Sequence, residues 1–195
     1  MAMSRPGGGP SESGENARRK TRLLQQAFWT GWKKLHGLKW QTTTMANGMD
    51  FEVWGPASVR RNDNFTLHRS NIENKLAQLQ EGRQLKYKMH GDSAYSNSDW
   101  IVSGGGKGMA AVRESIEWTY KDLKNMWAFC NYERCLKLVN QPLAKIFFVC
   151  MLLRNAHITL NGCQTSAYFN MLPPTLDDWT KNGPQFKPIP NDIFN

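Results

Sequence analysis

Cysteine and histidine are scarce in this chain, and neither is arranged for zinc. There are four histidines, which complete no zinc spacing, and four cysteines, none of which forms a C-x₂-C pair: Cys130, Cys135, Cys150 and Cys163. The small number and the spacing of these residues exclude zinc-finger proteins and small proteins that are held together by disulfide bonds. We therefore expect free, buried thiols in a reducing compartment.

Long apolar runs and a secretory signal are lacking too. The apolar segment 144–153 contains Lys145, is followed by Arg154, and is too short to cross a bilayer. We expect a buried helix there and no membrane partner. The predicted location is intracellular: nuclear, or otherwise cytoplasmic.

Acidic residues are outnumbered by basic ones. The chain of 195 residues has 25 Lys and Arg against 16 Asp and Glu, giving a net charge of +9. Such a charge favours a polyanionic partner, with nucleic acid first and an anionic membrane surface second, although an incidental basic charge is the alternative. The length fits one domain, because domains commonly hold about 100 to 200 residues.

The first half of the chain predicts a hairpin after an irregular start. Residues 1–25 are expected to be loop or disorder, because Pro, Gly and Ser dominate the beginning. Segments 36–45 and 49–54 flank Asn47-Gly48, a strong hairpin signal. We expect Gly55-Pro56 to end the second strand.

The remaining elements follow from apolar spacing. Asn62-Asp63 starts a helix that Gly82 ends, a short strand follows, and two long helices come next. The run 103–108 lacks the spacing of a phosphate-binding loop and is expected to be flexible. The predicted ranges are strand 85–90, helix 109–129, helix 143–159, a catalytic-type domain over 26–180, and an irregular tail from Pro173 onward that includes 181–195.

Asp92 and Glu117 are the candidate site. Asp92 follows the predicted strand 85–90, at the end where open α/β sheets place their ligands, and Glu117 lies on the next helix. Two such carboxylates can converge on Mg²⁺ or Mn²⁺, which supports phosphodiester chemistry. The alternatives are an Asx-turn at Asp92 and a pairing of Glu117 with a lysine one helical turn away.

No third carboxylate is evident. Asp63 precedes an apolar stripe and fits a helix N-cap better than a metal ligand. Asp50 and Glu52 alternate with Met49, Phe51 and Val53, so we expect them on the solvated face of the hairpin.

Several segments resemble successive motifs of the DDE-type superfamily endonucleases, the catalytic domains of PIF/Harbinger-like transposases. They are Gly31–Trp40, Gly55-Pro56 with Asp63, Gly91–Tyr95, Arg113–Trp118 and Leu152–His157. The resemblance implies an α/β, ribonuclease-H-like fold, DNA as substrate and a divalent metal cofactor (Mg or Mn). It implies that Asp92 is the second catalytic Asp and Glu117 the final Glu.

The resemblance also implies that the first catalytic Asp and the first strand would fall before Met1, because Ser4-Arg5-Pro6 matches a later segment. The expected function is therefore a transposon-derived endonuclease domain that is inactive for lack of that Asp. The alternative is a non-enzymatic, domesticated or decaying fragment that binds DNA or protein. Target choice would need a separate DNA-binding partner protein, and the oligomeric state is open.

Basic residues near these motifs are the candidate DNA contacts. They are Lys33, Lys34, Arg60, Arg61 and Arg113. Each could bind a phosphate or be solvated. The cluster Arg18–Arg22 could serve nuclear targeting or phosphate contact, or be solvated.

Overall fold

The computed structural model describes residues 3–4, 14–31, 34–82, 84, 87–131, 136–137 and 142–182. The described residues form a mixed α/β arrangement whose strands pair two by two: β1 with β8, β2 with β3, β4 with β5, and β6 with β7. The ribonuclease-H-like topology stays a prediction. The helices are α1 (Gly14–Phe28), α2 (Asp63–Ser70), α3 (Ile72–Leu79), α4 (Lys107–Met126), α5 (Leu143–Asn161), α6 (Gln164–Tyr168) and α7 (Leu176–Asn182), with a 3₁₀ turn at Ala128–Cys130. The strands are β1 (Met3–Ser4), β2 (Trp29–Thr30), β3 (Leu35–His36), β4 (Leu38–Thr44), β5 (Asp50–Ser58), β6 (Met89–Gly91), β7 (Ile101–Ser103) and β8 (Leu136–Lys137).

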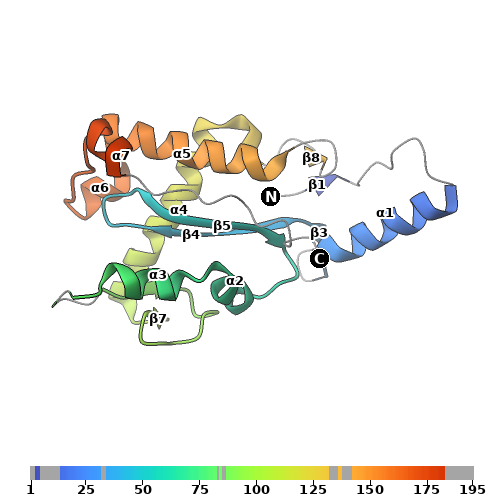
Figure 1. Cartoon of the computed structure of the whole chain (residues 1–195), viewed down its shortest axis with the longest axis horizontal. Coiled ribbons are helices and arrows are strands. Elements are labelled where there is room, and N and C mark those ends of the chain that lie inside the picture. The colour runs from blue at the N-terminus through green and yellow to red at the C-terminus, as the bar shows by residue number, and fades with distance from the viewer. Residues whose placement is uncertain are drawn as a thin grey trace.

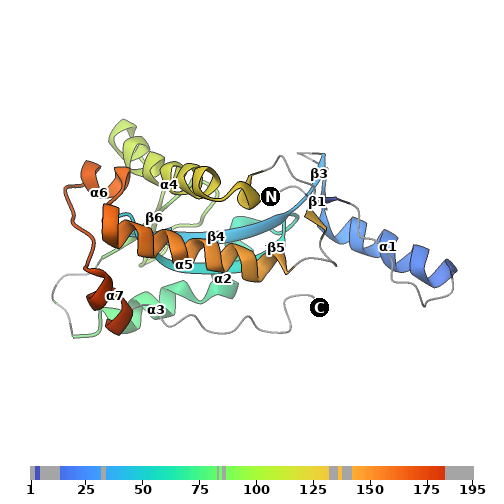
Figure 2. The same ribbon diagram turned by 90° about the horizontal axis from the view of Figure 1, so that it is seen from above.

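The β4–β5 hairpin is the middle layer (Figure 1). Helix α5 runs along one side of it, and α2 and α3 lie on the other. Figure 2 shows α4 beside α5 when the molecule is seen from above, and the two helices are in contact. The core on the α5 side joins Leu123, Phe147 and Met151 to the hairpin through Trp40 and Val53. On the other side, Phe51 packs against Leu67 of α2 and Ile72 of α3, so the hairpin carries apolar contacts on both faces.

The predicted hairpin turn is confirmed. Gly48 adopts a φ of 85°, and the Met45 amide donates to the Met49 carbonyl at 2.9 Å. A Cβ added to Gly48 would meet Cys163 Sγ at 2.0 Å, because the segment before α6 packs directly on the turn. The Cys163 thiol also faces the Asn47 carbonyl at 3.9 Å.

The predicted end of the second strand was wrong. β5 continues through Gly55-Pro56 to Ser58, where Ser58 pairs with Leu38 and Ala57 with Lys39. The strand register shifts between Lys39 and Gln41, and such an irregularity accommodates a proline that lacks an amide donor.

A second register shift corrects the prediction for Asp50 and Glu52. Thr44 pairs with Asp50 and Thr43 with Glu52, which leaves Phe51 as an extra, bulged residue. A one-residue shift exchanges the two faces of a strand, so Asp50 turns to the α5 side together with Val53. Asp50 is 2% exposed, and Glu52 pairs with Lys75 of α3. The prediction that both side chains lie on a solvated face was therefore wrong.

Helices occur where irregular chain was predicted at both ends. Residues 14–28 form α1, although 1–25 were expected to be loop, and residues 176–182 form α7 within the expected irregular tail. The segment 183–195 lies outside the described residues. Helix α1 was not predicted because its segment is polar. It has too few apolar residues to show one apolar side at helical spacing.

The helix predicted from Asp63 to Gly82 is two helices. Asn71 has a φ of 56°, the left-handed region, and separates α2 from α3. The N-cap is Asn62, whose side chain accepts from the Phe65 amide at 2.7 Å; Asp63 is the first helical residue. The N-cap prediction was therefore wrong by one residue.

Helix α5 is only partly buried. By length and hydropathy it could cross a membrane, yet Met151 and Ile158 are fully buried in the core and the helix packs against β5, α4 and α7. Val149 and Leu153 of the same helix are exposed. The prediction of a buried helix thus holds for one of its faces.

Candidate functional site

Asp92 follows the strand β6 as predicted, although that strand is shorter than residues 85–90. β6 pairs in parallel with β7, so that Met89 faces Ile101 and Gly91 faces Ser103. Residues 87 and 88 are not in a strand, and 85 and 86 lie outside the described residues. Parallel strands end at the same edge, so Asp92 and the glycine-rich segment 104–106 before α4 leave the sheet together.

The loop that carries Asp92 is fixed to α2. The Asn64 side chain accepts from the Ser96 amide at 2.9 Å and donates to the Ala94 carbonyl at 3.3 Å. Asp92 Oδ1 accepts from the Ser93 amide at 2.6 Å. These bonds orient the carboxylate while its side chain stays 59% exposed.

Tyr95 explains the pattern Gly-Asp-Ser-Ala-Tyr. A Cβ on Gly91 would lie 3.0 Å from Tyr95 Cδ2, so the ring packs over the glycine. Burial raises the pKa of the Tyr95 hydroxyl to about 12, and the charges of Asp63 and Asp92 contribute in the same direction. The Tyr95 hydroxyl therefore stays protonated even well above neutral pH.

Arg113 connects Asp92 to helix α4. Its Nη2 lies 3.5 Å from Asp92 Oδ1. Glu117 lies one helical turn further along α4, a rise of about 6 Å, and is exposed. Asp92 thus contacts the side chain of an α4 residue that precedes Glu117 by one helical turn.

Other carboxylates near this face have partners of their own. Asp63 Oδ1 is 2.7 Å from Lys39 Nζ, and Glu52 pairs with Lys75. Among the residues that the structure describes, no group of three or more Asp, Glu, His or Cys side chains could hold a metal ion. Asp92 and Glu117 provide hard oxygen donors suited to one largely hydrated Mg²⁺ or Mn²⁺. This donor set does not extend to a two-metal centre within the described part of the chain.

The polar centre of the molecule was not predicted. Arg154 of α5 is fully buried; its Nη1 lies 3.0 Å from Asp50 Oδ2 and donates to the Gly48 carbonyl at 3.0 Å. Its Nη2 reaches Thr119 Oγ1 and Asp122 Oδ2 of α4, both at 3.4 Å. One guanidinium thereby ties α5 to the hairpin turn and to α4.

Asn155 completes this polar centre. Its amide donates to the Asp50 carbonyl and accepts from the Asp50 amide, both at 2.9 Å. Burial raises the pKa of the Asp50 carboxyl, while Arg154 and the Thr44 hydroxyl act in the opposite direction. The Arg-Asn dipeptide directly after the apolar run 144–153, inside the same helix, was the signal that could have suggested this role.

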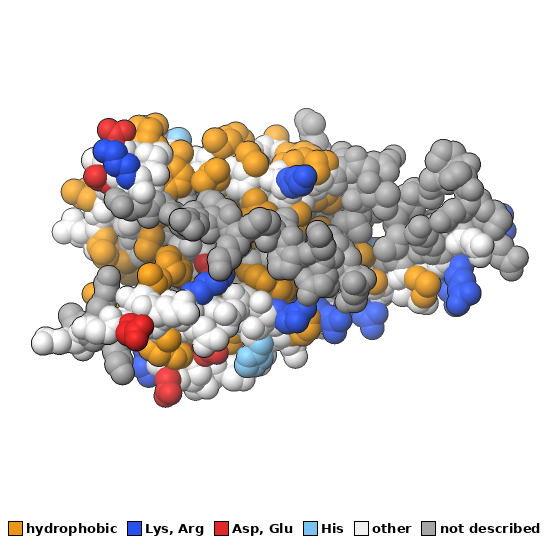
Figure 3. All heavy atoms as spheres, viewed as in Figure 1, with side chains coloured by type: hydrophobic (Ala, Val, Ile, Leu, Met, Phe, Trp, Pro, Cys, Tyr) orange, Lys and Arg blue, Asp and Glu red, His pale blue; other side chains and the backbone are white. Residues whose placement is uncertain are grey.

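The predicted DNA contacts fall into separate environments. Lys34, Arg60 and Arg61 are exposed near the β3 strand and the end of β5, and the Arg61 guanidinium lies 4.6 Å from the centre of the Phe65 ring. Arg113 is engaged with Asp92, and Lys33 lies outside the described residues. Figure 3 shows Lys and Arg side chains along the lower edge of this face, from its centre toward α1.

The comparisons assign the chain to a family. The sequence model of the family described as "DDE superfamily endonuclease" matches residues 16–155. This chain therefore belongs to the DDE superfamily of endonucleases, which are generally divalent-metal dependent and whose substrate is DNA. No curated protein and no solved structure shows a significant match.

Proposed function

We propose that this chain is a transposon-derived DDE domain of the PIF/Harbinger type that binds DNA and holds one divalent cation weakly between Asp92 and Glu117. The observation that carries the proposal is the 3.5 Å contact of Asp92 with Arg113, an α4 residue that lies one helical turn before Glu117. Supporting it is the family match, which spans both residues.

The cation would be Mg²⁺ or Mn²⁺, bound mainly by water. A divalent ion at this place would polarise a phosphate oxygen and stabilise charge on a leaving oxygen. Arg113 contacts Asp92 Oδ1, so a cation that binds this oxygen would compete with the arginine for it. Tyr95 would remain a hydrogen-bond donor beside the site.

Hydrolysis of DNA needs a third carboxylate, which the described residues do not supply at this face. The same observation favours the second candidate function, a domesticated, non-enzymatic DNA-binding domain. We propose that Asp92 and Glu117 alone bind the cation without turnover. A nuclear location, promoted by the exposed Arg18, Arg19 and Arg22, and a separate partner protein that selects the target site complete this proposal.

DNA binding is proposed to be tolerant of sequence and sensitive to salt. The exposed Arg22, Lys34, Arg60 and Arg61 can contact phosphates, and the net charge of +9 attracts any duplex. Each neutralised phosphate adds about 0.9 to the log–log salt slope on duplex DNA. Affinity for unrelated duplexes, measured across low to moderate salt, tests this; a flat salt response would contradict it.

The metal site is tested by Mn²⁺ titration followed by paramagnetic broadening. Asp92→Asn and Glu117→Gln should each weaken binding, whereas Glu114→Gln, an exposed acid on the same helix, should leave it unchanged. Equal Mn²⁺ binding by the unaltered chain and the three variants would overturn the proposed metal site. Mn²⁺-dependent plasmid nicking that Asp92→Asn abolishes would show that the chain supplies a third carboxylate after all.

A further inference from the structure

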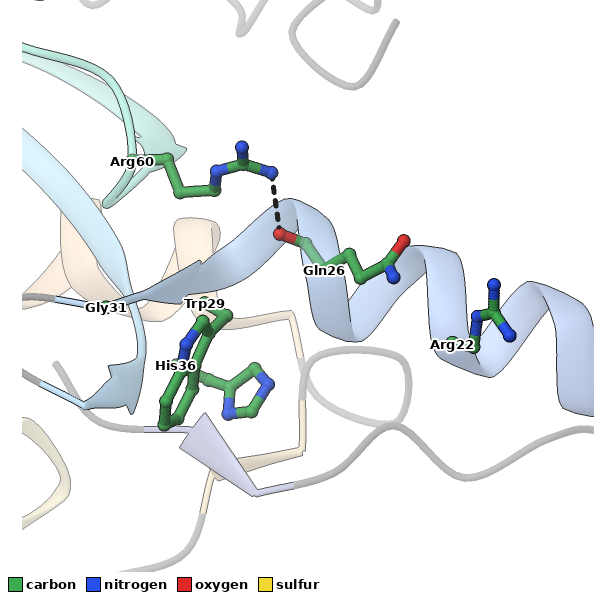
Figure 4. Close-up of a pocket in the computed structure, with 6 residues that line it drawn as sticks. All are labelled: Arg22, Gln26, Trp29, Gly31, His36 and Arg60. Atoms are coloured by element: carbon green, nitrogen blue, oxygen red, sulfur yellow. Dashed lines mark hydrogen bonds between the residues drawn. The ribbon is translucent and has the colours of Figure 1, made fainter.

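A hollow of about 630 Å³ lies where α1 meets the β2–β3 pair, away from Asp92. Figure 4 shows the residues that line it: Arg22, Gln26, Trp29, Gly31, His36 and Arg60. None of these lining residues is acidic, and two are arginines. The chemistry of the hollow therefore combines positive charge with an aromatic wall.

Trp29 forms that wall. It pairs with His36 across β2 and β3, and the two rings lie 4.9 Å apart between their centres with an interplanar angle of 57°. Trp29 is still 41% exposed, and no atom of the described residues lies within 4 Å of a Cβ built on Gly31. The strand pairing holds the indole in place, and the open space beside Gly31 leaves room for a flat ligand.

The two arginines approach from different elements. Arg60 Nη1 donates to the Gln26 carbonyl at 2.9 Å, which fixes this guanidinium next to α1 and leaves its remaining donors for a ligand. Arg22 lies one helical turn before Gln26 and is exposed. Two guanidiniums and an aromatic ring that line one hollow suit a phosphate attached to a planar base.

We propose that this hollow binds an unpaired nucleotide of DNA, with its base stacked on Trp29 and its phosphates contacted by Arg22 and Arg60. The inference rests on the proposed DNA-binding function and adds a preference for single-stranded or distorted segments. In a duplex the base faces are stacked on one another, so only an unpaired base can use the indole. Stacking also tolerates any base, because every base has an aromatic face.

The test compares fluorescence anisotropy of a labelled single-stranded oligonucleotide and of a duplex of equal length. Trp29→Ala should weaken single-strand binding about ten-fold, which corresponds to about 1.4 kcal/mol, and change duplex binding less. Trp29→Phe should retain most of the affinity. The matched control is Tyr168→Ala, which removes another exposed aromatic ring on α6, at the other end of the molecule (Figure 1).

Charge is tested separately. Arg22→Gln and Arg60→Gln should each lower the single-strand salt slope by about 0.7, whereas Lys181→Gln on α7 should not. An oligonucleotide carrying 5-iodouracil should cross-link to Trp29 in the unaltered chain, a readout that needs no variant to fold. Equal losses of affinity for single strand and duplex in the variants, or no cross-link at Trp29, would overturn the proposed nucleotide site. The proposed DNA-binding function would still stand. Failure of both DNA forms to bind at low salt would overturn the proposed function as well.

Discussion

Two arginine–aspartate pairs of this molecule have the same chemistry and opposite surroundings. Arg154 and Asp50 meet at 3.0 Å with side chains 0% and 1% exposed. Arg113 and Asp92 meet at 3.5 Å with side chains 45% and 59% exposed. Both pairs connect a helix to the strand region, but only the second faces solvent.

The difference in exposure indicates different roles for the two pairs, one in stabilising the fold and the other in binding a ligand. Arg154 is surrounded by acceptors from the hairpin and α4, so removing it leaves buried polar groups without a partner. Arg113 and Asp92 can each exchange the other for water or an ion at little cost. A buried pair of this kind is expected to hold the fold, and an exposed one to be available to a ligand.

The largest expected effect comes from breaking the buried pair. Arg154→Leu should lower the free energy of unfolding by about 3–5 kcal/mol, because the Asp50 carboxyl and the Gly48 carbonyl would stay buried without their partner. Urea denaturation measures this. The matched variant Arg113→Leu should cost about 1 kcal/mol or less. Similar losses for both variants would contradict the distinction between the two pairs.

Asn155→Ala should have the next largest effect. It leaves the Asp50 amide and carbonyl without their 2.9 Å partners, and buried unsatisfied groups cost about 1–3 kcal/mol each. We expect a loss of about 2–4 kcal/mol in urea denaturation. Asn161→Ala, at the exposed end of the same helix, is the control and should change stability by about 0.5 kcal/mol or less.

Removing Arg113 should change cation binding in the direction opposite to its effect on stability. Arg113→Gln frees Asp92 Oδ1 from a competing cation, so Mn²⁺ should bind a few-fold more tightly, on the order of 1 kcal/mol. Calorimetric titration measures this. Weaker Mn²⁺ binding in the variant would show that Arg113 positions Asp92 rather than competing for it.

The smallest effect is expected for Asp92→Asn on stability. The exposed carboxylate contributes an ion pair that is screened by solvent. The substitution should therefore change the free energy of unfolding by about 0.5 kcal/mol or less, as measured by thermal unfolding. A loss of several kcal/mol would mean that the loop after β6 depends on the charge of Asp92. The variant would then be unsuitable as a test of metal binding.

Local signals predicted the elements that contacts between distant residues did not alter. Asn47-Gly48 predicted the hairpin, and apolar spacing predicted α4 and α5 to within a few residues. The position of Asp92 after a strand was also predictable. The contact of Asp92 with Arg113 was not predictable, because the spacing of residues in the sequence does not show how a loop packs against a helix.

The role of Asp50 could not be read from alternation. A bulge at Phe51 exchanges the two faces of the strand, and nothing in the local pattern marks it. Its partner Arg154 lies far away in the chain, directly after the apolar run 144–153. Burial of both charges depends on tertiary packing, which a period-two pattern cannot describe.

The close approach of Gly48 to Cys163 has an evolutionary consequence. A side chain at position 48 would occupy the space of the Cys163 sulfur, so the two positions share one small volume. A larger residue at 163 would push on the turn of the hairpin, and with it on the Gly48 carbonyl that Arg154 binds. Substitutions at the two positions should therefore be inherited together, and a lineage that loses the glycine should also reshape the segment before α6.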